Sequence, residues 1–198
     1  MAFDTFDEGI SLGGVRSKTE IRTLICYMFD KVNVPMKKET IVTALQQKGL
    51  ANYFESSSCF DDLYKNNNLK LTDEDNRLFI LTDAGKLIAK QLEDTLALTV
   101  KEKALECTLY LLEKERVEKE NVVTISKVDN GYNVNCSISG GDMELMKFSV
   151  YVPDINLARM VRKNFHKNPQ LMYNVMIAML TRNKDLVNDA LTDLNSRL

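Results

Sequence analysis

The side chains of this sequence that could bind an anion lie where helices are expected to begin. Lys37 and Lys38 lie at the start of residues 36–48, whose periodic apolar residues predict a helix that stops at Gly49. A helix start favours anions such as phosphate, because its unpaired N–H groups and its dipole present positive charge. Two solvated lysines would give the same pattern, and the sequence leaves both interpretations open.

Catalytic chemistry has no comparable support in the sequence. The one histidine, His166, cannot form a multi-histidine metal site, and we expect it at the surface near a helix C-terminus. No glycine pair has the spacing of a phosphate-binding loop. Asp61 and Asp62 are neighbours on an expected helix and therefore point about 100° apart. We expect neither an enzyme nor a bound metal or cofactor.

The composition predicts a globular protein of the cytoplasm. A hydrophobic fraction of 44% and a charged fraction of 27% are typical of such proteins, and no apolar run approaches the ~20 residues of a membrane helix. The N-terminus lacks the basic start and apolar stretch of a secretory signal. We therefore expect no membrane contact, and reduced, buried thiols at four separated cysteines: Cys26, Cys59, Cys107 and Cys136.

The elements around the two lysines follow from the apolar pattern. Ser17 and Glu20 form a capping box, and the helix after it has a buried stripe and ends before Pro35. This stripe consists of Ile21, Leu24, Ile25, Met28 and Phe29. Another helix is predicted over residues 53–66, with its apolar face formed by Phe60, Leu63 and Tyr64.

A hairpin and a further helix follow. Two apolar runs, residues 69–71 and 78–81, flank a polar tip, which is the pattern of two strands joined by a solvated loop. Thr82 or Asp83 then caps a helix whose apolar stripe is Leu87, Ile88 and Leu92.

This order of elements resembles a winged-helix domain. Leu81-Thr82, Gly85 and Ala89 are similar to the junction between wing and helix in many bacterial winged-helix regulators. The whole chain also resembles an uncharacterised bacterial family with an N-terminal winged helix. The segments that carry this resemblance are Phe3-Asp4-Thr5-Phe6, Asn52-Tyr53-Phe54-Glu55, Asn130-Gly131-Tyr132-Asn133-Val134 and Tyr151-Val152-Pro153-Asp154. It implies an α+β protein with a winged helix-turn-helix domain over residues 1–95, including an N-terminal arm with Phe3 and Phe6.

The resemblance implies a dimeric DNA-binding transcriptional regulator. Lys37 and Lys38 would bind phosphates. The groove-facing helix would contribute Ser57, Ser58 and Lys65, and the wing would contribute Lys70 and Arg77.

The charge distribution opposes this interpretation. Residues 1–95 contain 12 basic and 15 acidic residues, a net charge of −3, whereas residues 96–198 contain 14 basic and 13 acidic residues, a net charge of +1. A DNA-binding module usually carries a basic patch. The sequence therefore leaves open a protein-interaction adaptor whose winged helix no longer binds DNA.

Residues 96–198 predict a connecting helix and an α+β C-terminal domain. Thr99 and Glu102 form a second capping box, before a helix that reaches about Glu120. Three strands, residues 122–125, 132–138 and 143–152, form an antiparallel meander around an Asn-Gly turn. A helix over residues 155–165 follows, with its inward side formed by Leu157, Met160 and Val161.

The last two predicted helices suggest how the protein assembles. Residues 169–180 carry a methionine-rich stripe, and residues 185–198 are amphipathic. These apolar stripes need a partner, either each other or a second subunit, and we expect a homodimer. A small-molecule effector pocket near the methionines is a weaker alternative, and no effector can be identified.

Overall fold

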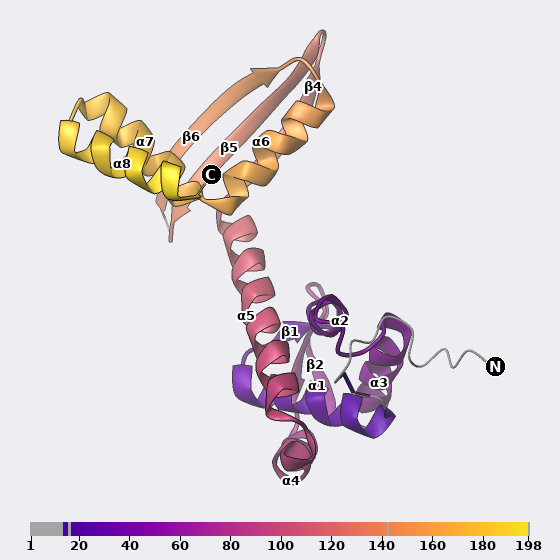
Figure 1. The fold of residues 1–198 in the computed structure, drawn as a ribbon. Coiled ribbons are helices and arrows are strands. Elements are labelled where there is room, and N and C mark those ends of the chain that lie inside the picture. The colour runs from indigo at the N-terminus through magenta and orange to yellow at the C-terminus, as the bar shows by residue number, and fades with distance from the viewer. Residues whose placement is uncertain (1–13, 16, 142, 198) are drawn as a thin grey trace, which may run out of the picture. The chain divides into compact units, whose positions relative to one another are not determined.

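The protein has an α+β fold in a computed structural model that describes residues 14–15, 17–141 and 143–197 (Figure 1). Its contacts divide the chain into two compact units, Met1–Glu113 and Lys114–Leu198. The predicted boundary at residues 95/96 stays a prediction, because helix α5 (Leu98–Glu120) contributes to each unit. The predicted N-terminal arm with Phe3 and Phe6 lies outside the described residues.

The first unit contains three helices, a small sheet and a fourth helix, followed by the start of α5. In chain order these elements are α1 (Lys18–Val32), β1 (Met36–Lys37), α2 (Lys38–Gln47), α3 (Tyr53–Lys65), β2 (Leu69–Asp73), β3 (Leu78–Leu81), α4 (Asp83–Leu92) and the short 3-10 helix η1 (Glu93–Thr95). The antiparallel sheet has the order β1-β3-β2.

Helix α1 forms the centre of this unit and matches its sequence signals. The capping box at Ser17 and Glu20 is present, and Asn33 ends the helix in the left-handed conformation with φ 52°. The five residues of the predicted stripe are all buried, together with Cys26. They pack against buried side chains of α2 and α3, including Ile41, Leu45 and Phe60.

The start of the second helix differs from the prediction. Residues 36–48 were expected to be one helix, but Met36 and Lys37 form strand β1, and α2 begins at Lys38. Met36 is fully buried and pairs with Phe79 of β3, so tertiary packing and sheet bonds outweigh the local helical pattern. Gly49 has φ 60°, as expected of a left-handed helix stop.

Two predicted apolar faces are also only partly correct. Phe60 and Leu63 are buried in α3, but Tyr64 is 44% exposed, because its ring packs edge-on against Phe79 at the surface. In α4 the buried positions are Gly85 and Ala89, whereas Leu87 is 57% exposed. Small residues line the buried side of α4 because this helix lies close to its neighbours.

Of the predicted caps of helices α4 and α5, the first is present and the second is not. Thr82 caps α4, since its hydroxyl accepts a hydrogen bond from the N–H of Gly85 at 3.3 Å. The predicted cap at Thr99 is wrong. Helix α5 begins one residue earlier, at Leu98, and the N–H groups of Val100 and Lys101 bond to the carbonyl of Ala97.

The second unit is a three-stranded antiparallel meander with helices, as predicted. Its strands are β4 (Val123–Val128), β5 (Gly131–Gly140) and β6 (Met143–Val152), in the order β4-β5-β6. Its helices are α6 (Ile155–Lys167), α7 (Pro169–Thr181) and α8 (Lys184–Arg197). Helix α6 lies along the sheet and contacts β5, and α7 packs beside α8 (Figure 1).

The inward face of α6 differs from the predicted one. Ala158 and Phe165 are buried against the sheet, whereas Leu157 is 37% exposed and Met160 is 56% exposed. Val161 packs against this core as predicted, so the buried side of α6 is rotated from the predicted one toward Ala158 and Phe165. His166 is half-buried rather than at the surface, with its Nε2 atom 2.8 Å from the main-chain oxygen of Asn121.

The cysteines are buried and free, which confirms their prediction as small hydrophobes. Within the described residues, no group of three or more histidine, cysteine, aspartate or glutamate side chains is arranged to hold a metal ion. A search of the described helices finds none with both the length and the apolar character required to cross a membrane.

Candidate nucleic-acid interface

The predicted site residues lie on the start of α2, along α3 and on the β2–β3 hairpin. Helix α3 begins after Asn52, whose side-chain oxygen accepts a 2.8 Å hydrogen bond from the N–H of Glu55. Phe60 anchors α3 by edge-on contact with Phe79 of the hairpin, with ring centroids 5.0 Å apart. The helix and the hairpin are therefore held together by the core of the first unit.

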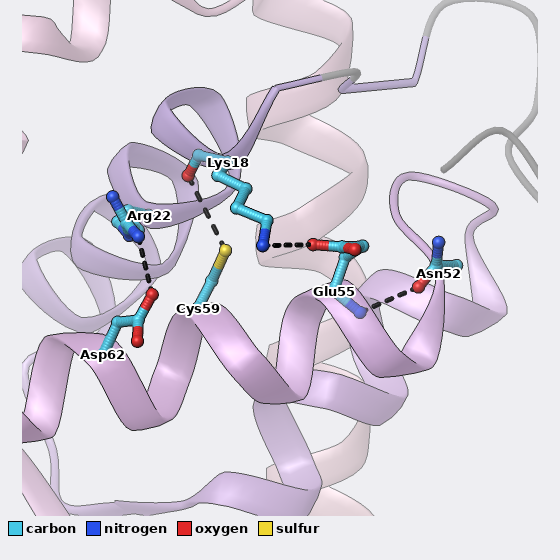
Figure 2. A network of polar contacts seen from close by, with 6 residues as sticks. All are labelled: Lys18, Arg22, Asn52, Glu55, Cys59 and Asp62. Atoms are coloured by element: carbon cyan, nitrogen blue, oxygen red, sulfur yellow. Dashed lines mark hydrogen bonds and ion pairs between the residues drawn. The ribbon is translucent and has the colours of Figure 1, made fainter. Parts of the chain in front are cut away.

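One side of α3 forms a polar seam with α1, shown in Figure 2. We use this name for Lys18 and Arg22 of α1 with Glu55, Cys59 and Asp62 of α3. Arg22 bonds to Asp62 at 2.6 Å, and Lys18 lies 3.5 Å from Glu55. The thiol of Cys59, between the two ion pairs, donates to the main-chain oxygen of Lys18 at 3.7 Å.

The environment of this seam shifts the pKa values of Asp62 and Cys59. The hydrogen bond from Arg22 is the main cause that lowers the pKa of Asp62 below its usual value. Burial raises the pKa of Cys59 to about 11, so this residue remains a neutral thiol. The seam is thus a structural contact between α1 and α3.

The remaining carboxylate of α3 pairs with a predicted phosphate-binding residue. The Nζ atom of Lys38 lies 2.7 Å from Oδ1 of Asp61 and 5.9 Å from the centre of the Phe60 ring. All three carboxylates of α3, at Glu55, Asp61 and Asp62, therefore have a cationic partner on α1 or α2. The charge of Lys38 is compensated in the same way.

A surface hollow of about 440 Å³ lies between α2, α3 and the hairpin. Lys38 and Arg77 both line it, so the structure brings these two predicted residues together. Arg77 has φ 51°, a left-handed conformation, at the end of the hairpin tip. Asp61 and Glu74 also line the hollow, which gives it a mixed charge rather than a positive one.

The other predicted residues do not join this hollow. Ser58 and Lys65 are exposed on α3, and Ser57 is half-buried. Lys70 is exposed on β2, and it lies on the strand face opposite Leu71 because successive side chains alternate. Lys37 is half-buried in an extended conformation directly before α2.

Sequence reasoning placed the start of α3 correctly at Tyr53 but missed Lys18 and Arg22. Lys18 and Arg22 are four residues apart and their partners Glu55 and Asp62 are seven residues apart, so each pair lies on one face of its helix, and this was a usable signal for a helix–helix seam. Tyr53 and Phe54 are 51% and 80% exposed, so α3 also presents an aromatic pair at its N-terminus.

Comparison with known proteins gives one match. The family described as Domain of unknown function (DUF4364) matches residues 21–180. No curated protein and no solved structure matches the chain.

Proposed function

The chain belongs to the DUF4364 family, whose function is unknown, and we propose that it is a winged-helix, DNA-binding transcriptional regulator. In this proposal α3 lies in the major groove, as the second helix of a helix-turn-helix does, and the β2–β3 hairpin is the wing. The second unit serves for dimerisation or for sensing.

The observation that carries this proposal is the position of strand β1. The order α1-β1-α2-α3-β2-β3, with β1 paired to β3 in a three-stranded sheet, is the order expected of a winged helix. Pairing between Met36 and Phe79 ties the turn before α2 to the hairpin. The hairpin and α3 are therefore fixed to the same base, which a shared DNA-contacting edge requires.

The ion pairs of α3 remove part of the objection from charge. A free carboxylate near a phosphate is repelled, but Glu55, Asp61 and Asp62 each form an ion pair within the unit. Ser58 and Lys65 remain exposed along α3, where a hydroxyl can bond to a base edge and a lysine to a phosphate.

Selection of genomic DNA fragments by the purified protein tests the proposal. We expect one or a few fragments to be enriched, and Ser58→Ala with Lys65→Gln to weaken binding to them by about tenfold or more, since a specific contact contributes about 1–3 kcal/mol. Lys90→Gln is the control for loss of a lysine charge, because Lys90 is exposed near the C-terminal end of α4 and is not among the proposed DNA-binding residues. Absence of any enriched fragment, or equal binding by the variant and the control, would refute the proposal.

A second candidate function is a protein-interaction adaptor that does not bind DNA. The exposed Tyr53 and Phe54 favour it, because aromatic side chains often anchor protein interfaces. Here Phe54→Ser should abolish capture of a specific, repeatedly recovered protein partner, while Tyr110→Ser on α5, another exposed aromatic, should not. Recovery of one specific DNA operator would rule this function out.

A further inference from the structure

Helix α6 of the second unit carries a row of exposed cations. Arg159, Arg162, Lys163 and Lys167 are all exposed, and α6 contains no acidic residue. None of the four has a carboxylate partner among the described residues, in contrast to Lys18, Arg22 and Lys38 around α3. We call these four residues the α6 cation row.

Three members of the α6 cation row lie on the side of the helix that faces away from the sheet, and the fourth, Arg162, lies beside the buried face. Ala158 and Phe165 are 0% and 1% exposed against β5. Arg159, Lys163 and Lys167 are four residues apart and so lie one above another on the opposite side. Like charges at this spacing repel each other, which makes the row unfavourable for the helix alone and favourable with an anionic partner.

The dimensions of the row fit a nucleic-acid backbone. Eight residues of helix separate Arg159 from Lys167, a distance of about 12 Å along the axis. One strand of B-DNA has a phosphate about every 3.4 Å along its axis, so about three to four phosphates lie within that length. The number of cations therefore matches the number of phosphates that they could contact.

A membrane surface is a poorer partner for the same row. A helix that binds a membrane inserts its apolar face between the lipids. In α6 that face is already occupied, because Ala158 and Phe165 are buried in the core of the second unit. The exposed apolar side chains Leu157 and Met160 are only two.

We propose that the α6 cation row binds the phosphate backbone of double-stranded DNA without sequence preference. This surface is additional to α3 and the hairpin, and it lies in the unit to which no DNA contact was assigned. The proposal rests on the proposed function for the class of ligand, but not on the role of α3.

The test measures how binding of a random-sequence 30-base-pair duplex by the full chain depends on salt. Each phosphate contact contributes about 0.9 to the slope of log Kd against log salt. The triple variant Arg159→Gln, Lys163→Gln, Lys167→Gln should therefore reduce the slope by about 2.7. The increase in Kd between 50 and 200 mM salt should then be about 40-fold smaller than for the wild type.

A matched control separates the row from net charge. Lys114→Gln, Lys127→Gln, Lys147→Gln removes the same three charges from scattered, exposed positions of the second unit. This control should keep a slope close to that of the wild type. Single Lys163→Gln, with an expected change of about 0.9, keeps the test valid if the triple variant unfolds.

The outcomes distinguish this proposal from the proposed function. Equal slopes for the triple variant and its control would overturn the role of the row, whereas loss of binding in the Lys65→Gln variant would still support α3. A reduced slope only in the triple variant would support the row, even if Lys65→Gln binds as the wild type does. No DNA binding by the wild type would overturn both, whereas DNA binding without salt dependence would overturn only the role of the row. Binding to vesicles containing phosphatidylserine in place of DNA would assign the row to membranes.

Discussion

Replacement of Gly85 by alanine has two opposite effects on stability, a gain in helix propensity and a loss from overpacking. Glycine within a helix costs about 1 kcal/mol relative to alanine, so helix propensity alone predicts that Gly85→Ala stabilises the protein. In the structure, however, a Cβ atom at this position would press against the main-chain oxygen of Asn68 and lie 2.5 Å from Cδ1 of Leu81. Packing therefore predicts the opposite result.

The carbonyl oxygen of Asn68 cannot move away from this Cβ atom without weakening its hydrogen bonds. The carbonyl oxygen of Asn68 accepts hydrogen bonds from both the N–H and the hydroxyl of Thr82, each at 3.0 Å. Overpacking costs about 1–3 kcal/mol, and a strained or lost hydrogen bond adds about 1 kcal/mol. After the propensity gain is subtracted, we expect Gly85→Ala to lower the free energy of unfolding by about 1–3 kcal/mol.

Urea unfolding, followed by circular dichroism, measures this effect. With a slope of about 1–3 kcal/mol per molar urea, the midpoint should fall by roughly 1 M. Ala84→Gly is the control, since Ala84 is exposed on the same helix and its replacement should cost only about 0.5–1 kcal/mol. A Gly85→Ala protein more stable than the wild type would refute the close packing of α4 against the hairpin.

Three further predictions concern the seam, the cysteines and the assembly. Arg22 lowers the pKa of Asp62 in the folded state, so their bond stabilises the fold above the usual aspartate pKa and is lost as pH falls through the lowered value. In urea unfolding, the loss of stability caused by Asp62→Asn should therefore shrink between about pH 5 and pH 2. A loss of stability that stays constant over this range would contradict the prediction. Burial raises the pKa of Cys26 to about 12 and of Cys136 to about 11. At about pH 8, a thiol reagent should therefore label the four free cysteines only after denaturation. Rapid labelling of the folded protein would disprove their burial. Met179 and Leu180 are 65% and 74% exposed on α7, and exposed apolar side chains of this kind mark an interface. Light scattering should therefore show a dimer for the wild type and a monomer for the variant Met179→Glu with Leu180→Glu. A wild type that is monomeric at tens of micromolar would remove the dimer from the proposal.

Local signals in the sequence predicted much of the fold. The capping box at Ser17 and the hairpin between β4 and β5 depend on a few neighbouring residues, and both are present. The turn itself differs from the predicted one, because its two loop residues are Asp129 and Asn130, and neither Asn130 nor Gly131 has a positive φ. Strand β1 was missed because two residues carry too little local information. It forms only through pairing with a strand more than 40 residues later, since Met36 lies opposite Phe79.

The inward face of α6 shows a second limit of the sequence. Its apolar residues form one broad face that runs from Met160 through Leu157 and Val161 to Phe165 and Ala158. The sheet packs on the part centred on Ala158 and Phe165, with Val161 partly buried beside them. The predicted face was centred too near Met160, which lies at the exposed end of this face.

The charge of the candidate site also depends on residues that are distant in the sequence. The acidic character of α3 suggested a surface that repels DNA, yet its carboxylates have partners that lie 23 residues away in the sequence for Asp61 and 40 residues away for Asp62. A sum of charges along residues 1–95 counts both members of each pair but does not show that they are paired. Because each pair sums to zero, the net charge of −3 belongs to other acidic residues of this range and not to the paired carboxylates of α3.

The informative charges are those that the fold leaves uncompensated. A fixed cation attracts a polyanion only if no nearby carboxylate cancels it, and the attraction increases when several such cations are aligned. Around α3 three cations, Lys18, Arg22 and Lys38, are paired with its carboxylates, whereas the four residues of the α6 cation row have no carboxylate partner among the described residues. If the chain binds DNA, α3 and the hairpin would then contribute mainly base contacts, with little dependence on salt, and α6 would contribute most of the salt dependence. Measuring specificity and salt slope separately for the Ser58→Ala and Lys163→Gln variants would show whether the two properties belong to different units.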